Sequence, residues 1–94
     1  MVVSRANAEV IGLKAVGWLA ANDELLPVFL GATGADEAQF RAGLQDPHFQ
    51  GSVLDFLLMD DAWISAFCDA EALPYSAPME ARAVLPGGEA VHWT

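Results

Sequence analysis

Apolar and polar residues recur along the chain with the spacing of helices. From Asp46 to about residue 58, large apolar side chains stand three and four residues apart: Phe49, Val53, Leu54, Phe56, Leu57 and Leu58. A second such run, from Asp60 to about residue 72, carries Trp63, Ile64, Phe67 and Cys68. Helices this apolar are usually central to a domain. The pattern therefore predicts a central helix pair at about 46–58 and 60–72.

Polar residues mark the starts of these two helices. Asp46 is suited to the N-cap position because its carboxylate accepts from free backbone N–H groups, and Pro47 fits the first helical position. Asp60 is the expected N-cap of the second helix. Met59 and Ile64 then have the spacing of a hydrophobic staple across that helix start.

The segment before this pair predicts three further helices. The first begins at the N-cap Ser4 and runs to about residue 21, with Gly12 and Gly17 inside it. Each glycine costs a helix about 1 kcal/mol relative to alanine. We expect the two glycines to let another helix approach closely; the alternative is that the helix merely tolerates them. The second helix is capped by Asn22-Asp23 and ends at Gly34. The third begins with a capping box formed by Asp36 and Gln39, and its Phe40 and Leu44 are expected to point inward.

After Leu73-Pro74, Pro78 opens a last short helix that ends before Pro86-Gly87-Gly88. No segment shows the alternation of a strand. The predicted fold is all-α, a compact bundle of five to six short helices. Residues 1–85 form a single helical domain, and residues 86–94 form a C-terminal tail.

Charge narrows the range of partners. The 94 residues include thirteen acidic and four basic ones, for a net charge of −9. This balance opposes binding to nucleic acids, which requires clustered lysine and arginine, and to anionic membrane surfaces. The apolar run from residue 10 to 21 is too short to span a bilayer and contains Lys14. With Cys68 as the single cysteine, we expect a cytoplasmic protein.

Cysteine, histidine and aspartate often act in catalysis or metal binding in other proteins, but in this chain their positions are explained by structural roles. Cys68 lies on the apolar side of its helix, and the histidines are His48, in a first helical turn, and His92, in the tail. Four aspartates are close in sequence but lack the spacing of a calcium loop: Asp55, Asp60, Asp61 and Asp69. We therefore predict no enzyme activity, no cofactor and no metal site.

Several landmarks together resemble a known family. They are Asn7-Ala8-Glu9, the segment from Phe29 to Gly34, Asp46-Pro47 followed by residues 53–58, Phe67-Cys68 and Leu73-Pro74. The chain resembles a family of small alpha-proteobacterial proteins known as a domain of unknown function, over roughly residues 5–85. The resemblance implies an all-helical bacterial protein and carries no activity.

Large apolar side chains are the candidates for an interaction. A domain this small does not readily bury all of them, and an exposed apolar patch often marks a partner site. The candidates in the helices are Trp18, Phe40, Trp63 and Met79, and those in the tail are His92 and Trp93. The alternatives are that the first four belong to the core and that the tail docks on its own domain.

The function that these features favour is a non-catalytic, acidic, helical protein-interaction module. Its partner would be another protein, bound by helix-in-groove packing with acidic residues at the rim. A homo-oligomer is compatible with the sequence but not indicated by it. The alternative function is a small helical protein that binds an apolar ligand in a pocket among its helices.

Overall fold

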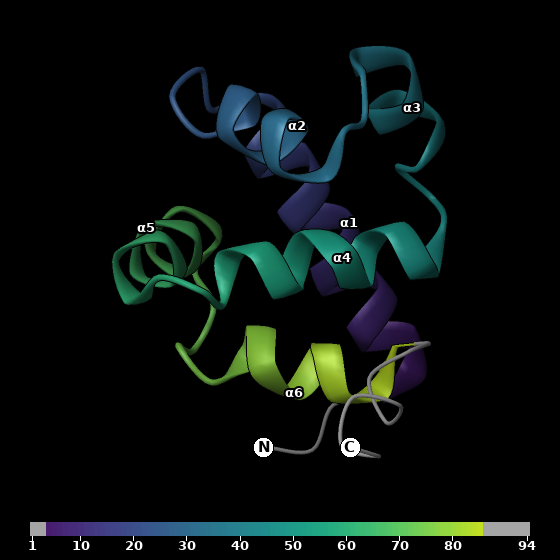
Figure 1. The fold of residues 1–94 in the computed structure, drawn as a ribbon. Helices are drawn as coiled ribbons and strands as arrows, with labels where there is room; N and C mark the ends of the chain where they lie inside the picture. The colour runs from purple at the N-terminus through teal and green to yellow at the C-terminus, as the bar shows by residue number, and fades with distance from the viewer. Residues whose placement is uncertain (1–3, 86–94) are drawn as a thin grey trace, which may run out of the picture.

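The structure is a computed structural model, and it describes residues 4–85. Figure 1 shows a bundle of helices, and the described range contains no strand. The helices are α1 (Arg5–Ala20), α2 (Leu26–Thr33), α3 (Glu37–Ala42), α4 (Pro47–Leu57), α5 (Asp61–Glu71) and α6 (Ala77–Val84). The predicted all-helical bundle is confirmed. None of these helices is long and apolar enough to cross a membrane. The predicted tail, residues 86–94, lies outside the described residues.

Helix α1 shares the centre of the bundle with the predicted pair. It passes behind α4 in Figure 1, and its most extensive contacts are with α4 and α6, whereas α4 contacts α5 less. The buried face of α1 combines small residues with large ones, among them Ala8, Ile11, Ala15 and Leu19. The small residues let neighbouring backbones come close, and the large ones fill the space between the helices.

The helix starts predicted at Ser4, Asp36, Asp46 and Asp60 are confirmed. The Ser4 hydroxyl, the Asp46 carboxylate and the Asp60 carboxylate each accept a hydrogen bond from a backbone N–H in the first turn of α1, α4 and α5. At α3, Asp36 and Gln39 form both bonds of the capping box. These caps depend on a few adjacent residues, which is why the sequence was enough to find them.

Two side-chain predictions are wrong. Met59 is 78% exposed, so it does not form a staple with Ile64, which packs into the core instead. Met59 lies in the turn between α4 and α5, and that turn directs its side chain to solvent. Leu44 is also exposed, while Phe40 is buried. Because α3 ends at Ala42, Leu44 is no longer on the helical face that carries Phe40.

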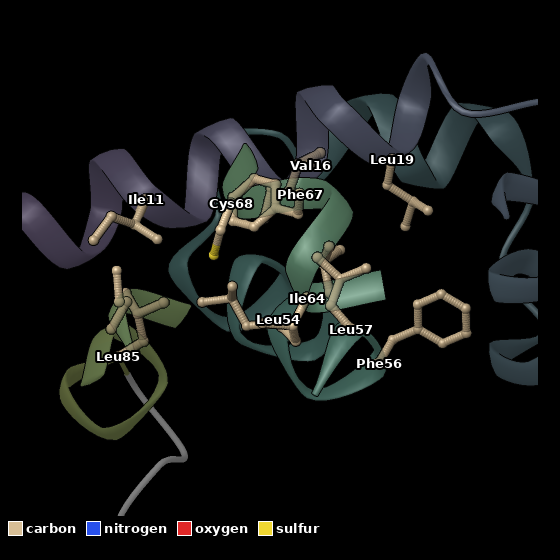
Figure 2. Packing of buried hydrophobic residues seen from close by; sticks show 14 of the residues in the cluster. Ile11, Val16, Leu19, Leu54, Phe56, Leu57, Ile64, Phe67, Cys68 and Leu85 are labelled. Atoms are coloured by element: carbon tan, nitrogen blue, oxygen red, sulfur yellow. The ribbon is translucent and has the colours of Figure 1, made fainter. Parts of the chain in front are cut away.

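The core combines side chains from α1, α4, α5 and the end of α6. In Figure 2, Ile11 and Leu85 point toward each other, and Phe67 and Cys68 lie between α1 and Leu54. All five are buried. The last described residue, Leu85, therefore belongs to the core.

Four phenylalanines form a second part of the core, at α2 and α3. The ring of Phe29 meets those of Phe40, Phe49 and Phe56 edge to face, at centroid distances of 5.7, 5.9 and 5.3 Å. Phe40 and Phe49 also meet edge to face, at 5.3 Å. This arrangement, called here the Phe29 cluster, joins α2 and α3 to α4.

Helices α4 and α6 are also joined by an ion pair. Arg82 Nε lies 2.7 Å from Asp55 Oδ1, and its Nη2 lies 2.9 Å from Asp55 Oδ2, so the guanidinium binds the carboxylate in a bidentate manner. The Arg82 side chain is only 14% exposed. Bidentate geometry and partial burial make this pair stronger than an exposed one.

Replacing Asp55 with alanine should destabilise the fold by about 1–2 kcal/mol, since it removes a bidentate carboxylate from a largely buried guanidinium. Urea unfolding followed by circular dichroism measures the change. The control is Glu9→Gln, which removes the partner of Arg5 from an exposed pair at 3.4 Å. The control should cost at most about 0.5 kcal/mol. Equal effects of the two substitutions would contradict this ranking.

Candidate partner-binding groove

Two of the predicted interaction residues, Trp18 and Trp63, are half-buried and line the same surface groove. The groove has a volume of about 270 Å³ and lies between the end of α1, the turn that follows it and α5. Its lining consists of Trp18, Asn22, Glu24, Leu25, Trp63 and Ala66. We call it the Trp18–Trp63 groove.

Each tryptophan is supported from beneath by a buried phenylalanine. Trp18 meets Phe67 edge to face at 5.7 Å, and Trp63 stacks on Phe56 at 4.7 Å with an interplanar angle of 23°. Phe67 and Phe56 belong to the core. The indole rings are therefore held in place before any partner binds, which reduces the entropy lost on binding.

The turn after α1, which contributes to the lining of the groove, is fixed by Asn22. Its Oδ1 accepts hydrogen bonds from the backbone N–H groups of Glu24 at 3.1 Å and Leu25 at 3.0 Å. This turn places the exposed Glu24 beside the indoles. It also delays the start of α2 to Leu26, later than the predicted start at Asn22-Asp23.

Sequence reasoning did not assign Asn22, Glu24, Leu25 and Ala66 to a site. Ala66 had a usable signal, because it lies three residues after Trp63 and so on the same side of α5. The other three had none, because their position beside Trp63 depends on how α1 packs against α5.

The other predicted interaction residues do not join this groove. Phe40 is 4% exposed and belongs to the Phe29 cluster. It is therefore a core residue, which was the alternative to a role in binding. Met79 is 62% exposed on α6 and does not line the groove. His92 and Trp93 lie outside the described residues.

A second hollow lies along the first half of α1. It has a volume of about 340 Å³ and is lined by Ala6, Glu9, Val10, Leu13, Gln45 and Gln50. Val10 and Leu13 are exposed. Gln50 is buried, and its Nε2 donates to the carbonyl of Leu44 at 3.0 Å. The hollow thus combines apolar side chains with amide groups and one carboxylate.

Cys68 is placed as a core residue. It is fully buried, and its Sγ lies 3.5 Å from the carbonyl oxygen of Pro74, to which the thiol donates. Burial, and to a lesser degree the charge of Asp69, raises the pKa of the thiol. A raised pKa disfavours the nucleophilic thiolate. Among residues 4–85, no three histidine, cysteine or acidic side chains are grouped so as to hold a metal ion.

We expect the Cys68 thiol to react with iodoacetamide at pH 8 at least about tenfold more slowly in the folded protein than in urea, because the folded thiol is buried and its thiolate is disfavoured. Mass spectrometry of timed samples measures the alkylated fraction. Similar rates in both states would show that the thiol is accessible and would reopen the question of a reactive cysteine.

Comparison with known proteins places the chain in a family. A family model described as a protein of unknown function (DUF3572) matches residues 5–88. The chain belongs to the DUF3572 family. The resemblance to a family of unknown function is thereby confirmed. No curated protein and no solved structure matches this DUF3572 chain. The groove must therefore be interpreted from its own residues.

Proposed function

We propose that this DUF3572 protein is a non-catalytic, helical protein-interaction module, and that the Trp18–Trp63 groove is its binding site. The observation that carries the proposal is the pair of half-buried indoles held at one groove by core phenylalanines. Tryptophan is enriched among the residues that dominate binding energy at protein interfaces. Rigid aromatic rings beside an acidic side chain offer such an anchor point.

The groove is small. Its volume of about 270 Å³ lies near the lower limit of the roughly 300–1,000 Å³ of typical small-molecule sites. It has room for one or two side chains of a segment that lies across α1 and α5. The net charge of −9 supports a protein partner over nucleic acid or an anionic membrane. The single cysteine supports a cytoplasmic location as part of the proposal.

An apolar-ligand protein is the second candidate function. The observation in its favour is the hollow of about 340 Å³ beside the exposed Val10 and Leu13. That volume is within the range of ligand sites, at its lower end. A ligand there would be held by apolar contacts, and the amide groups of Gln45 and Gln50 also belong to the lining.

The test blocks the groove without touching the core. Ala66 is exposed and lines the groove, so Ala66→Gln should fill part of it while keeping the helix. The matched control is Ala83→Gln, an exposed alanine of α6 outside the lining. Tagged wild type and both variants are used to capture partners from native lysate at low and high salt, with mass spectrometry as the readout.

A protein recovered near stoichiometry by the wild type and by Ala83→Gln, but lost with Ala66→Gln, is the expected result. Recovery of the same proteins by all three would overturn the assignment of the groove. Recovery of no protein at either salt would overturn a stable protein partner. A second copy of this chain would be recognised as a homo-oligomer by its own peptides and by sedimentation of the untagged protein.

A further inference from the structure

We infer that the Trp18–Trp63 groove binds an arginine side chain of the partner, with the two indoles contacting the guanidinium and Glu24 as its counter-ion. The inference rests on the proposed function and names the chemistry of the partner. It follows from three properties of the groove: the ring type, the sign of its charge and its apolar wall.

Indole is the side-chain ring that attracts a cation most strongly, and a planar guanidinium stacks on it more readily than an ammonium does. Phe56 stacks on one face of Trp63, and the half-buried indole lines the groove. Trp18 lines the groove from α1. A guanidinium inserted between α1 and α5 would therefore contact both indoles.

The charge of the groove is negative. Glu24 is the charged residue of its lining, and Asp23 precedes it in the same turn. Helix α5 contains acidic residues and neither lysine nor arginine. The nearest cation on α1 is Lys14, one turn before Trp18 and outside the lining. In a chain with a net charge of −9, this leaves a negative potential that attracts a basic side chain.

The arginines of the chain itself are engaged elsewhere. Arg82 binds Asp55, and the exposed pairs join Arg5 to Glu9 at 3.4 Å and Arg41 to Glu37 at 3.8 Å. Among residues 4–85, no arginine therefore competes for the carboxylate of Glu24.

The apolar part of the lining fits the stem of an arginine. Leu25 and Ala66 line the groove together with the indoles. Arginine places its three methylene groups along apolar surface while its charged head reaches a polar partner. An arginine entering past Ala66 would cover these two side chains and bring its guanidinium to the indoles and Glu24. Apolar neighbours of that arginine in the partner would then pack on the rim of the groove.

The test uses two small probes on the whole chain: acetyl-arginine amide and acetyl-citrulline amide. Citrulline has nearly the shape of arginine but no charge. The indole N–H signals of ¹⁵N-labelled protein are assigned with Trp18→Phe and Trp63→Phe and followed during titration. The arginine probe should shift the signals of Trp18 and Trp63 saturably, with an affinity about two- to fivefold higher than that of citrulline.

Glu24→Gln should lower the affinity for the arginine probe by about two- to fivefold and leave the affinity for citrulline unchanged. Glu37→Gln makes the same charge change on α3, outside the lining, and should leave both affinities unchanged. Equal affinities for the two probes, the absence of shifts at both indoles, or an unchanged arginine affinity in Glu24→Gln would each overturn the inference.

Failure of the arginine inference can be distinguished from failure of the proposed function. If Ala66→Gln loses a partner but the groove binds the arginine probe no better than the citrulline probe, the arginine inference is overturned. The proposed interaction module is then unaffected. If no partner were sensitive to Ala66→Gln, the groove would be overturned as the binding site of the proposed function, and the partner arginine with it, whatever the probes show.

Discussion

Replacing Phe29 with alanine is expected to lower the free energy of unfolding by about 3–5 kcal/mol. Phe29 is 1% exposed and meets three other phenylalanine rings edge to face. The substitution removes a buried ring, leaves a cavity and breaks all three of these ring contacts. Small domains have about 5–15 kcal/mol of stability in total, so the loss would be a large part of it. Urea unfolding followed by tryptophan fluorescence measures the change.

The loss should also be local, because α2 and α3 are joined to α4 through the Phe29 cluster. In native-state hydrogen exchange, the backbone amides of α2 and α3 should lose more protection than those of α1 and α4. The matched control is Val28→Ala, on the same helix, where the side chain is 48% exposed. This control should cost less than about 1 kcal/mol. Uniform loss of protection in Phe29→Ala would show that α2 and α3 do not form a separate unit.

Alanine substitutions at Gly12 and Gly17 are expected to change stability in opposite directions. A methyl group at Gly12 would lie 2.8 Å from both Cβ and Oε1 of Gln50 on α4. Because Cβ of Gln50 is fixed to the backbone, the contact can be relieved only by moving the helices apart. Overpacking of this kind costs about 1–3 kcal/mol. Gly12→Ala should therefore destabilise the protein despite the better helix propensity of alanine.

Gly17→Ala is the matched control on the same helix. The position is exposed, and a methyl group there would meet no atom within 4 Å outside its own helix backbone. Only helix propensity then counts, and the protein should gain about 0.5–1 kcal/mol. Thermal unfolding of the two variants measures both effects. If both substitutions raised the melting temperature, the close approach of α1 and α4 at Gly12 would be contradicted.

These two glycines show what the sequence determined and what it left open. Both were predicted to let a helix approach closely; Gly12 does so, and the prediction for Gly17 is wrong. Spacing within α1 cannot separate them, because the difference depends on where α4 crosses. The caps at Ser4, Asp36 and Asp46, in contrast, depend on neighbouring residues, and all three were found.

In the candidate groove, too, local features were predictable from the sequence and contacts between distant helices were not. Trp18 and Trp63 were recognised as interaction candidates from their size and helical position. That they line one groove was not predictable, because it requires the packing of α1 against α5 and the turn built by Asn22. The ion pair between Arg82 and Asp55 is another contact between helices far apart in sequence, and no local pattern points to it.

The packing of α1 against α4 and α6 has a consequence for synthesis of the chain. Helix α1 leaves the ribosome before its main partners, α4 at residues 47–57 and α6 at residues 77–84. At about 5–20 residues per second, its apolar face waits roughly 3–13 seconds for α6. During this interval the nascent chain displays Ile11, Val16 and Leu19 uncovered. Exposed apolar surface of this kind makes an incomplete chain prone to aggregation and is what general chaperones bind.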